Sequence, residues 1–179
     1  MTVFRLKMCA WLLAVSASAI THAGGLYQSP EAFLNEVFRG TPPPPQVVWL
    51  RGDIREAADE IMGHRYPGLR IRYWSSDGRS AWILDEIGKE RPITTGLVIS
   101  GDAIELVRVL EYRESRGGEV RHPFFTQQFN GARLVKENRI DRNIDGISGA
   151  TLSVRALEKL ARLALYLHSK TIPLDDTAQ

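Results

Sequence analysis

Residues 69–112 contain two strand–turn–strand patterns in direct succession, and these constrain the fold more than any other part of the chain. The first pattern turns at Asp77-Gly78 and the second at Gly101-Asp102, and each turn lies between segments with the alternating apolar or β-branched residues of strands. The segments are 69–73 and 81–84 in the first pattern, and 94–100 and 103–112 in the second. Four antiparallel strands are therefore expected.

Three other segments have the apolar spacing of amphipathic helices. The first begins at Ser29-Pro30, where a capping hydroxyl precedes a proline at the first helical position. The second opens with Asp53 and Glu56, which have the spacing of a capping box. The segments are 29–40, 53–64 and 152–168. Helices packed on a twisted antiparallel sheet make an α+β fold, with the last amphipathic helix at the C-terminal end of the domain.

The first 23 residues have the pattern of a secretory signal peptide. Arg5 and Lys7 precede an apolar run over residues 8–20, and a small residue, Ala23, precedes two glycines. The run is shorter than the roughly 20 residues that a membrane-spanning helix needs. We therefore expect export to the periplasm, with an uncleaved N-terminal membrane anchor as the alternative.

Composition limits the chemistry of the exported chain. The single cysteine, Cys9, lies inside the expected signal, so no disulfide, thiol nucleophile or cysteine metal site remains. Loss of Arg5 and Lys7 lowers the formal net charge from +2 to zero, which removes the electrostatic basis for binding nucleic acid. No two histidines have metal-ligand spacing, and no Walker loop, Rossmann fingerprint or nucleophile elbow occurs. We therefore expect no metal site, no catalytic residue and no nucleic-acid partner.

The segment before the last helix has the features of a phosphate site. Residues 145–151 read Asp-Gly-Ile-Ser-Gly-Ala-Thr. The two glycines permit tight or left-handed backbone, Ala150 keeps bulk away, and Thr151 presents a hydroxyl beside the N–H groups and the positive dipole end of a helix. The alternative is an ordinary helix cap, in which Ser148 or Thr151 accepts backbone hydrogen bonds.

This segment resembles the flavinylation motif of the FMN-binding domain family, which includes the G subunit of the Rnf electron-transport complex and the C subunit of the sodium-pumping NADH:quinone reductase. The acidic residue, the small hydroxyl residue and the Gly-Ala-Thr all match. The resemblance implies that Thr151 Oγ carries FMN through a phosphoester, formed by a magnesium-dependent flavin transferase with FAD as donor. It also implies recognition and packing roles around the cofactor for Asp145, Gly146, Ser148, Gly149 and Ala150.

The resemblance extends more loosely over residues 95–168, and it has departures. Glu114-Ser115-Arg116-Gly117 stands where the complex subunits usually carry Glu-Thr-Pro-Gly. The resemblance therefore implies no particular contact between this loop and the flavin ring. The chain also lacks a clear membrane helix and resembles the small exported members of the family. The expected division is a signal peptide (1–23), an N-terminal helix with a proline-rich spacer (24–46), an FMN-binding domain (47–172) and a polar tail (173–179).

The export signal and the motif together favour an electron carrier that works between a membrane redox protein and an acceptor. A covalent tether would keep FMN on an exported protein even where the non-covalent affinity is modest. The expected partners are the flavin transferase and the membrane redox protein. Two alternatives stay open, a self-contained FMN-dependent reductase and a non-redox exported binding module. Arg155, one turn along the last helix, could pair with the phosphate or lie on a solvated face.

Overall fold

The computed structural model describes residues 25–172, so the expected signal peptide and polar tail lie outside the described residues. Its main feature is a six-stranded antiparallel sheet with the strand order β1-β6-β5-β4-β3-β2. The strands are β1 (Gly25–Leu26), β2 (Gln46–Trp49), β3 (Arg70–Ser76), β4 (Arg79–Ile87), β5 (Pro92–Ser100) and β6 (Ala103–Tyr112).

Both hairpins predicted from the sequence are present, as β3–β4 and β5–β6. The expectation of four strands was incomplete, because β1 and β2 add one strand at each edge of the sheet. β1 pairs only Gly25 and Leu26 with β6, and β2 has four residues directly after the prolines. Edge segments this short carry too little alternation to be recognised in a sequence.

The helices of the described chain are α1 (Pro30–Val37), α2 (Asp53–Met62), α3 (Pro123–Thr126) and α4 (Thr151–Thr171). α1 begins as predicted, since Ser29 Oγ accepts a hydrogen bond from the Ala32 N–H at 3.1 Å. The predicted capping box of α2 is wrong, because Gly52 is the N-cap and no side chain caps the helix. α2 also ends at Met62, before the predicted end at residue 64, because Gly63 adopts the left-handed conformation.

The segment between β6 and α4 forms short elements rather than one open loop. They are the 3-10 helices η1 (Gly118–Arg121), η2 (Gln127–Phe129) and η3 (Lys136–Asn138), the helix α3, and a small second sheet of β7 (Leu134–Val135) and β8 (Arg139–Ile140). Phe125 and Phe129 from this segment are fully buried and pack edge to face.

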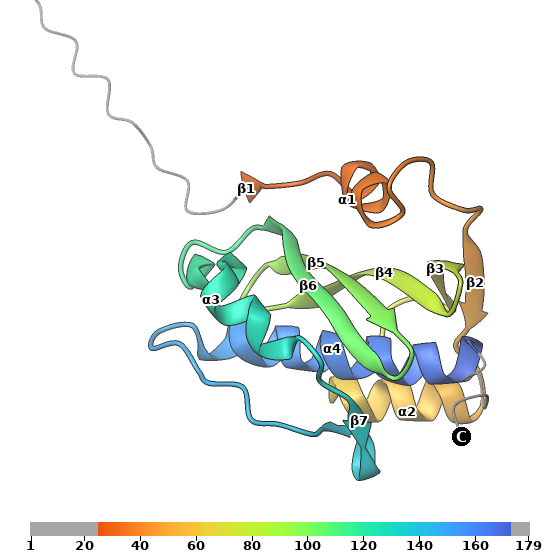
Figure 1. Cartoon of the computed structure of the whole chain (residues 1–179). Helices are drawn as coiled ribbons and strands as arrows, with labels where there is room; N and C mark the ends of the chain where they lie inside the picture. Colours follow the sequence, from red (N-terminus) through yellow and green to blue (C-terminus); the bar gives the residue numbers. More distant parts are fainter. Residues whose placement is uncertain (1–24, 173–179) are drawn as a thin grey trace, which may run out of the picture.

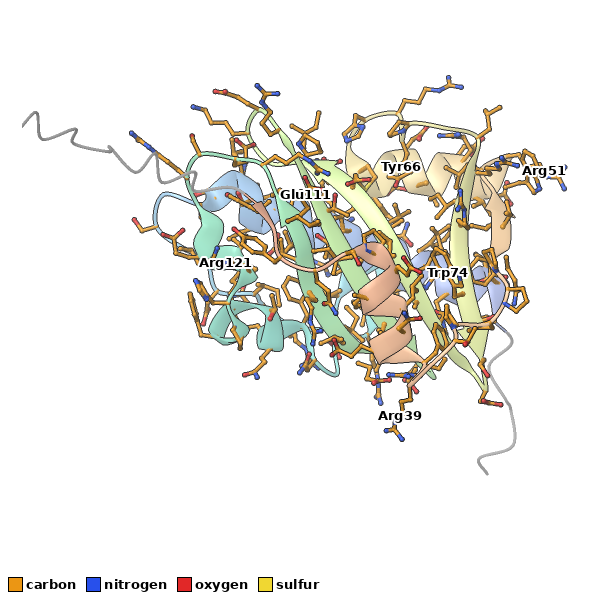
Figure 2. The ribbon with its side chains drawn as sticks, turned by 90° about the horizontal axis from the view of Figure 1, so that it is seen from above. Arg39, Arg51, Tyr66, Trp74, Glu111 and Arg121 are labelled. Atoms are coloured by element: carbon orange, nitrogen blue, oxygen red, sulfur yellow. The ribbon has the colours of Figure 1, made fainter. Side chains whose placement is uncertain are left out.

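The helices cover the two faces of the sheet unequally (Figure 1). α4 and α2 lie on one face and enclose the larger core, in which Leu157, Leu160 and Trp82 are fully buried. α1 lies across the other face of the sheet (Figure 2). Phe33 of α1 packs so closely over Gly96 that a Cβ at Gly96 would come within 2.6 Å of the phenyl ring. The predicted α+β architecture is confirmed.

A buried chain of hydrogen bonds fixes the C-terminal half of α4 to the sheet. The indole N–H of Trp82 donates to Ser80 Oγ at 2.7 Å, and the Ser80 hydroxyl donates to His168 Nδ1 at 2.6 Å. His168 Nε2 then donates to the Gly101 carbonyl at 2.7 Å, in the turn between β5 and β6. Burial lowers the pKa of His168 more than the hydrogen bond to the Gly101 carbonyl raises it, so the imidazole is neutral at neutral pH.

We expect Ser80→Ala to lower the free energy of unfolding by about 2 kcal/mol, because it leaves the Trp82 N–H and His168 Nδ1 buried without partners. Urea denaturation followed by tryptophan fluorescence measures the change. Ser76→Ala is the matched control, since Ser76 is an exposed serine whose hydroxyl donates to the neighbouring Asp77, and it should change stability by less than about 0.5 kcal/mol. Equal losses in the two variants would contradict this role for the network.

Candidate functional site

Thr151 is the first residue of α4, and its side chain is exposed. The helix has Ala150 as its N-cap and no capping hydrogen bond from a side chain, so neither Ser148 nor Thr151 acts as the ordinary cap that the sequence left open. The N–H groups of the first turn have no carbonyl of their own helix to bind. An exposed hydroxyl therefore lies beside free N–H donors at the positive end of a 21-residue helix.

The small residues of the motif allow a close contact with the loop after β6. Gly149 has a φ of +80°, a conformation that glycine adopts without strain, and it brings Ala150 into the protein, where Ala150 is 3% exposed. Ala150 packs against Gly117, and a Cβ built at Gly117 would lie 3.1 Å from the Ala150 Cβ and 2.9 Å from the Tyr112 hydroxyl. Larger side chains at positions 117 and 150 would force the loop away from α4.

The Tyr112 hydroxyl joins the three segments that meet at this contact. It donates to the Arg116 carbonyl in the loop, and it lies 2.9 Å from Ser153 Oγ in the first turn of α4. Tyr112 itself ends β6 and is fully buried. One side chain of the sheet therefore fixes the loop and the start of the helix relative to each other.

The beginning of the motif is held by a side-chain amide. Gln128 Oε1 accepts a hydrogen bond from the Asp145 N–H at 2.7 Å, and Gln128 Nε2 lies 3.5 Å from the Asp145 carbonyl. The Asp145 carboxylate is exposed and is 3.4 Å from the Asn143 side-chain amide. The path of the chain into residues 145–151 is thus set by η2, which the buried Phe129 anchors in the core.

Glu114 clamps the turn between β4 and β5 to the loop after β6. Its Oε1 accepts hydrogen bonds from the backbone N–H groups of Lys89, Glu90 and Arg91 at 2.5, 2.6 and 2.9 Å. Burial acts to raise the pKa of Glu114, but these three N–H donors outweigh it and the pKa is lowered. The carboxylate is therefore ionised at neutral pH, although the residue is only 6% exposed.

Two adjoining open cavities lie around this junction. The first, of about 550 Å³, contains Thr151, and the second, of about 590 Å³, lies beside η1. Ser115, Arg116 and Gly149 line both cavities. The first is otherwise lined by Lys89, Glu90, Glu114, Ala150, Thr151, Leu152 and Ser153, and the second by Gly117, Gly118, Glu119, Arg121, His122 and Ser148.

The structure brings together some of the residues expected to bind the cofactor and leaves others apart. Thr151 and Ala150 line the first cavity, Ser148 the second, and Gly149 both. Asp145 and Gly146 line neither cavity, and what the structure shows for Asp145 is a backbone held by Gln128. Arg155 also lines neither cavity and is exposed on α4.

Sequence reasoning missed the residues that position the motif. Tyr112 looked like an ordinary strand residue, and Ser153 like a polar residue of the last helix. Glu114 and Gly117 stand out in the sequence only as part of a loop that departs from the pattern of the complex subunits. Their contacts join positions far apart in the chain, 41 residues apart for Tyr112 and Ser153, so spacing gives no signal for them.

The arrangement suits a phosphate joined to a threonine hydroxyl, with an attached group lying in the cavities. Free N–H groups and Lys89 can offset negative charge beside Thr151.

Within residues 25–172 no three His, Cys, Asp or Glu side chains gather as a metal site would require. Over the same residues, no helix combines the length and apolar character needed to cross a membrane.

We expect Glu114→Ala to destabilise the fold by about 2–3 kcal/mol at neutral pH, because three backbone N–H groups lose a charged acceptor. Because the folded-state pKa of Glu114 is lowered, its contribution is complete above the ordinary glutamate value of 4.5 and is lost as the pH falls through the folded-state pKa.

Urea denaturation at neutral pH and at several pH values below 4.5 measures this effect. The difference in free energy of unfolding between wild type and Glu114→Ala should become smaller in acid. Glu60→Ala, which removes an exposed carboxylate from α2, is the control and should leave stability almost unchanged. A gap that is independent of pH would show that Glu114 acts through packing alone.

Comparison with known proteins identifies the family. Residues 88–166 match the family model described as FMN-binding domain. The fold is similar to that in the crystal structure of Shewanella oneidensis NqrC, with 16% sequence identity and a TM-score of 0.55, over 75% of this chain and 82% of that chain. No curated protein sequence gives a significant match. The match over residues 88–166 confirms the resemblance to the FMN-binding domain family.

Proposed function

We propose that this member of the FMN-binding domain family is an exported electron carrier whose FMN is joined to Thr151 Oγ through a phosphoester. The geometry of Thr151 supports this most strongly. Thr151 is exposed, its side chain does not cap the helix, and it lines a cavity of about 550 Å³ at the start of α4.

Several residues of the chain suit this attachment. The N–H groups of the first turn of α4 lie where they can offset the charge of a phosphate on Thr151. Lys89 lines the same cavity, with its ammonium 3.5 Å from the Glu90 carboxylate. Ala150 and Gly117 together leave no bulky side chain at the base of the motif. Glu114 and Tyr112 hold the surrounding loops, so the hydroxyl is presented on a rigid support.

In the attachment step FAD is the donor of FMN. Thr151 Oγ forms a bond to the phosphorus of the FMN half, the pyrophosphate bond of FAD breaks, AMP leaves and the hydroxyl proton is lost. The flavin transferase would supply the magnesium ion and the base for this step. Exposure of Thr151 matters here, because the hydroxyl must enter the active site of another protein.

Bound FMN supplies the redox chemistry, and the protein supplies retention, orientation and electrostatics. An exported protein gains from a covalent bond, because released cofactor would be diluted outside the cytoplasm. The signal-like pattern of residues 1–23 supports a periplasmic location, and a membrane redox protein is the proposed electron partner.

Intact mass of the full chain, co-expressed with a flavin transferase and isolated from the periplasm, tests the proposal. We expect the mass of the chain without residues 1–23 plus one FMN, with the corresponding visible flavin spectrum, and complete loss of the adduct in Thr151→Ala. Thr41→Ala is the matched control, since it makes the same substitution at an exposed threonine that lines neither cavity, and it should keep the adduct.

An unmodified, colourless wild-type chain in the presence of active transferase would contradict the proposal and favour a non-redox binding module. Rapid reduction of the purified flavoprotein by a soluble donor, without any membrane fraction, would instead favour a self-contained reductase. Retention of residues 1–23 in the isolated protein would indicate a membrane anchor in place of a cleaved signal.

A further inference from the structure

Arg116 lies between the two cavities of the site and lines both of them. Its backbone is fixed on the C-terminal side, because its carbonyl accepts the hydrogen bond from Tyr112 and the next residue, Gly117, packs against Ala150. The base of this side chain is therefore held in place, while the side chain itself is exposed at the cavities.

The guanidinium of Arg116 has no hydrogen-bond or ion-pair partner within residues 25–172, and the Glu119 carboxylate, which lines only the second cavity, has none either. The other charges around the cavities are paired. Arg121, which lines only the second cavity, donates to the Tyr27 hydroxyl at 2.6 Å and stacks over its ring. The Glu114 carboxylate accepts hydrogen bonds from three backbone N–H groups. Lys89 Nζ lies 3.5 Å from Glu90 Oε1, so these two charges form an ion pair. Arg116 is thus a free guanidinium at the centre of the site.

The position of Thr151 limits where the parts of FMN can lie. A phosphate bonded to Thr151 Oγ must remain at the start of α4, among the N–H groups of the first turn. The ring system lies at the other end of the ribityl chain, and the rest of the first cavity or the adjoining second cavity can hold it. Arg116 lines both, and it therefore flanks the ring in either case.

We propose that Arg116 contacts the flavin ring and sets its reduction potential by stabilising the reduced form. The proposal rests on the attachment of FMN proposed above. When FMN takes two electrons from a donor protein and one proton from water, the ring acquires one negative charge. A guanidinium beside the ring lowers the free energy of that anion relative to the neutral oxidised ring, so it raises the potential.

The test is a spectroelectrochemical titration of the flavinylated protein, with dithionite as reductant and ferricyanide as oxidant. We expect Arg116→Gln to shift the redox equilibrium at least about tenfold toward the oxidised form, which is about 30 mV for a two-electron couple. Arg116→Lys keeps the positive charge and should stay closer to the wild-type potential.

Arg51→Gln is the matched control, because it removes the same charge from an exposed site at the opposite end of the molecule from Arg121 (Figure 2). Its potential should equal that of the wild type. Intact mass is measured first on every variant, so that occupancy and potential are known separately.

An adduct in Arg116→Gln with the wild-type potential would overturn the role of Arg116 and leave the proposed function standing. A folded Arg116→Gln chain that takes up no FMN would also overturn it, because the residue would then act in attachment. Absence of the adduct from the wild type would overturn the proposed function, and this proposal with it.

Discussion

The contact between Gly117 and Ala150 is the constraint on which the rest of the site depends. Backbone and methyl group meet so closely that the loop after β6 and the start of α4 form one surface, with the Tyr112 hydroxyl at its base. Glycine and alanine are needed here for lack of bulk, and Gly117 also has a φ of +81°. This approach positions Thr151, which directly follows Ala150.

The two ends of α4 are held by different means, and both serve to place Thr151. At the C-terminal end, His168 is bound in the buried network with Ser80 and the Gly101 carbonyl. At the N-terminal end, Ser153 contacts Tyr112 while Thr151, two residues earlier, remains exposed. A helix fixed to the sheet at both ends presents its first residue with little freedom, which suits a residue that carries a cofactor.

The sequence was sufficient for those features that depend on local pattern. Both hairpins and the last helix follow from alternation and helical spacing, and Thr151 was expected at the helix start. The capping box of α2 failed because Gly52, a residue without a side chain, takes the cap position instead of Asp53. The links from Tyr112 to Ser153 and from Glu114 to the turn at residues 89–91 depend on tertiary packing, which no spacing rule describes. Asp145 matches the motif through its residue type, and the structure adds that its backbone N–H is held by Gln128, which the sequence does not indicate.

The proposed function requires that one particular hydroxyl, Thr151 Oγ, receives FMN covalently. Peptide mapping by mass spectrometry, after denaturation and proteolysis of the flavinylated chain, identifies the modified residue. We expect the FMN phosphate to remain on Thr151, while Ser153, buried and bound to Tyr112, is unmodified. Flavin on Ser148 or Ser153, or flavin released from the chain on denaturation, would contradict it.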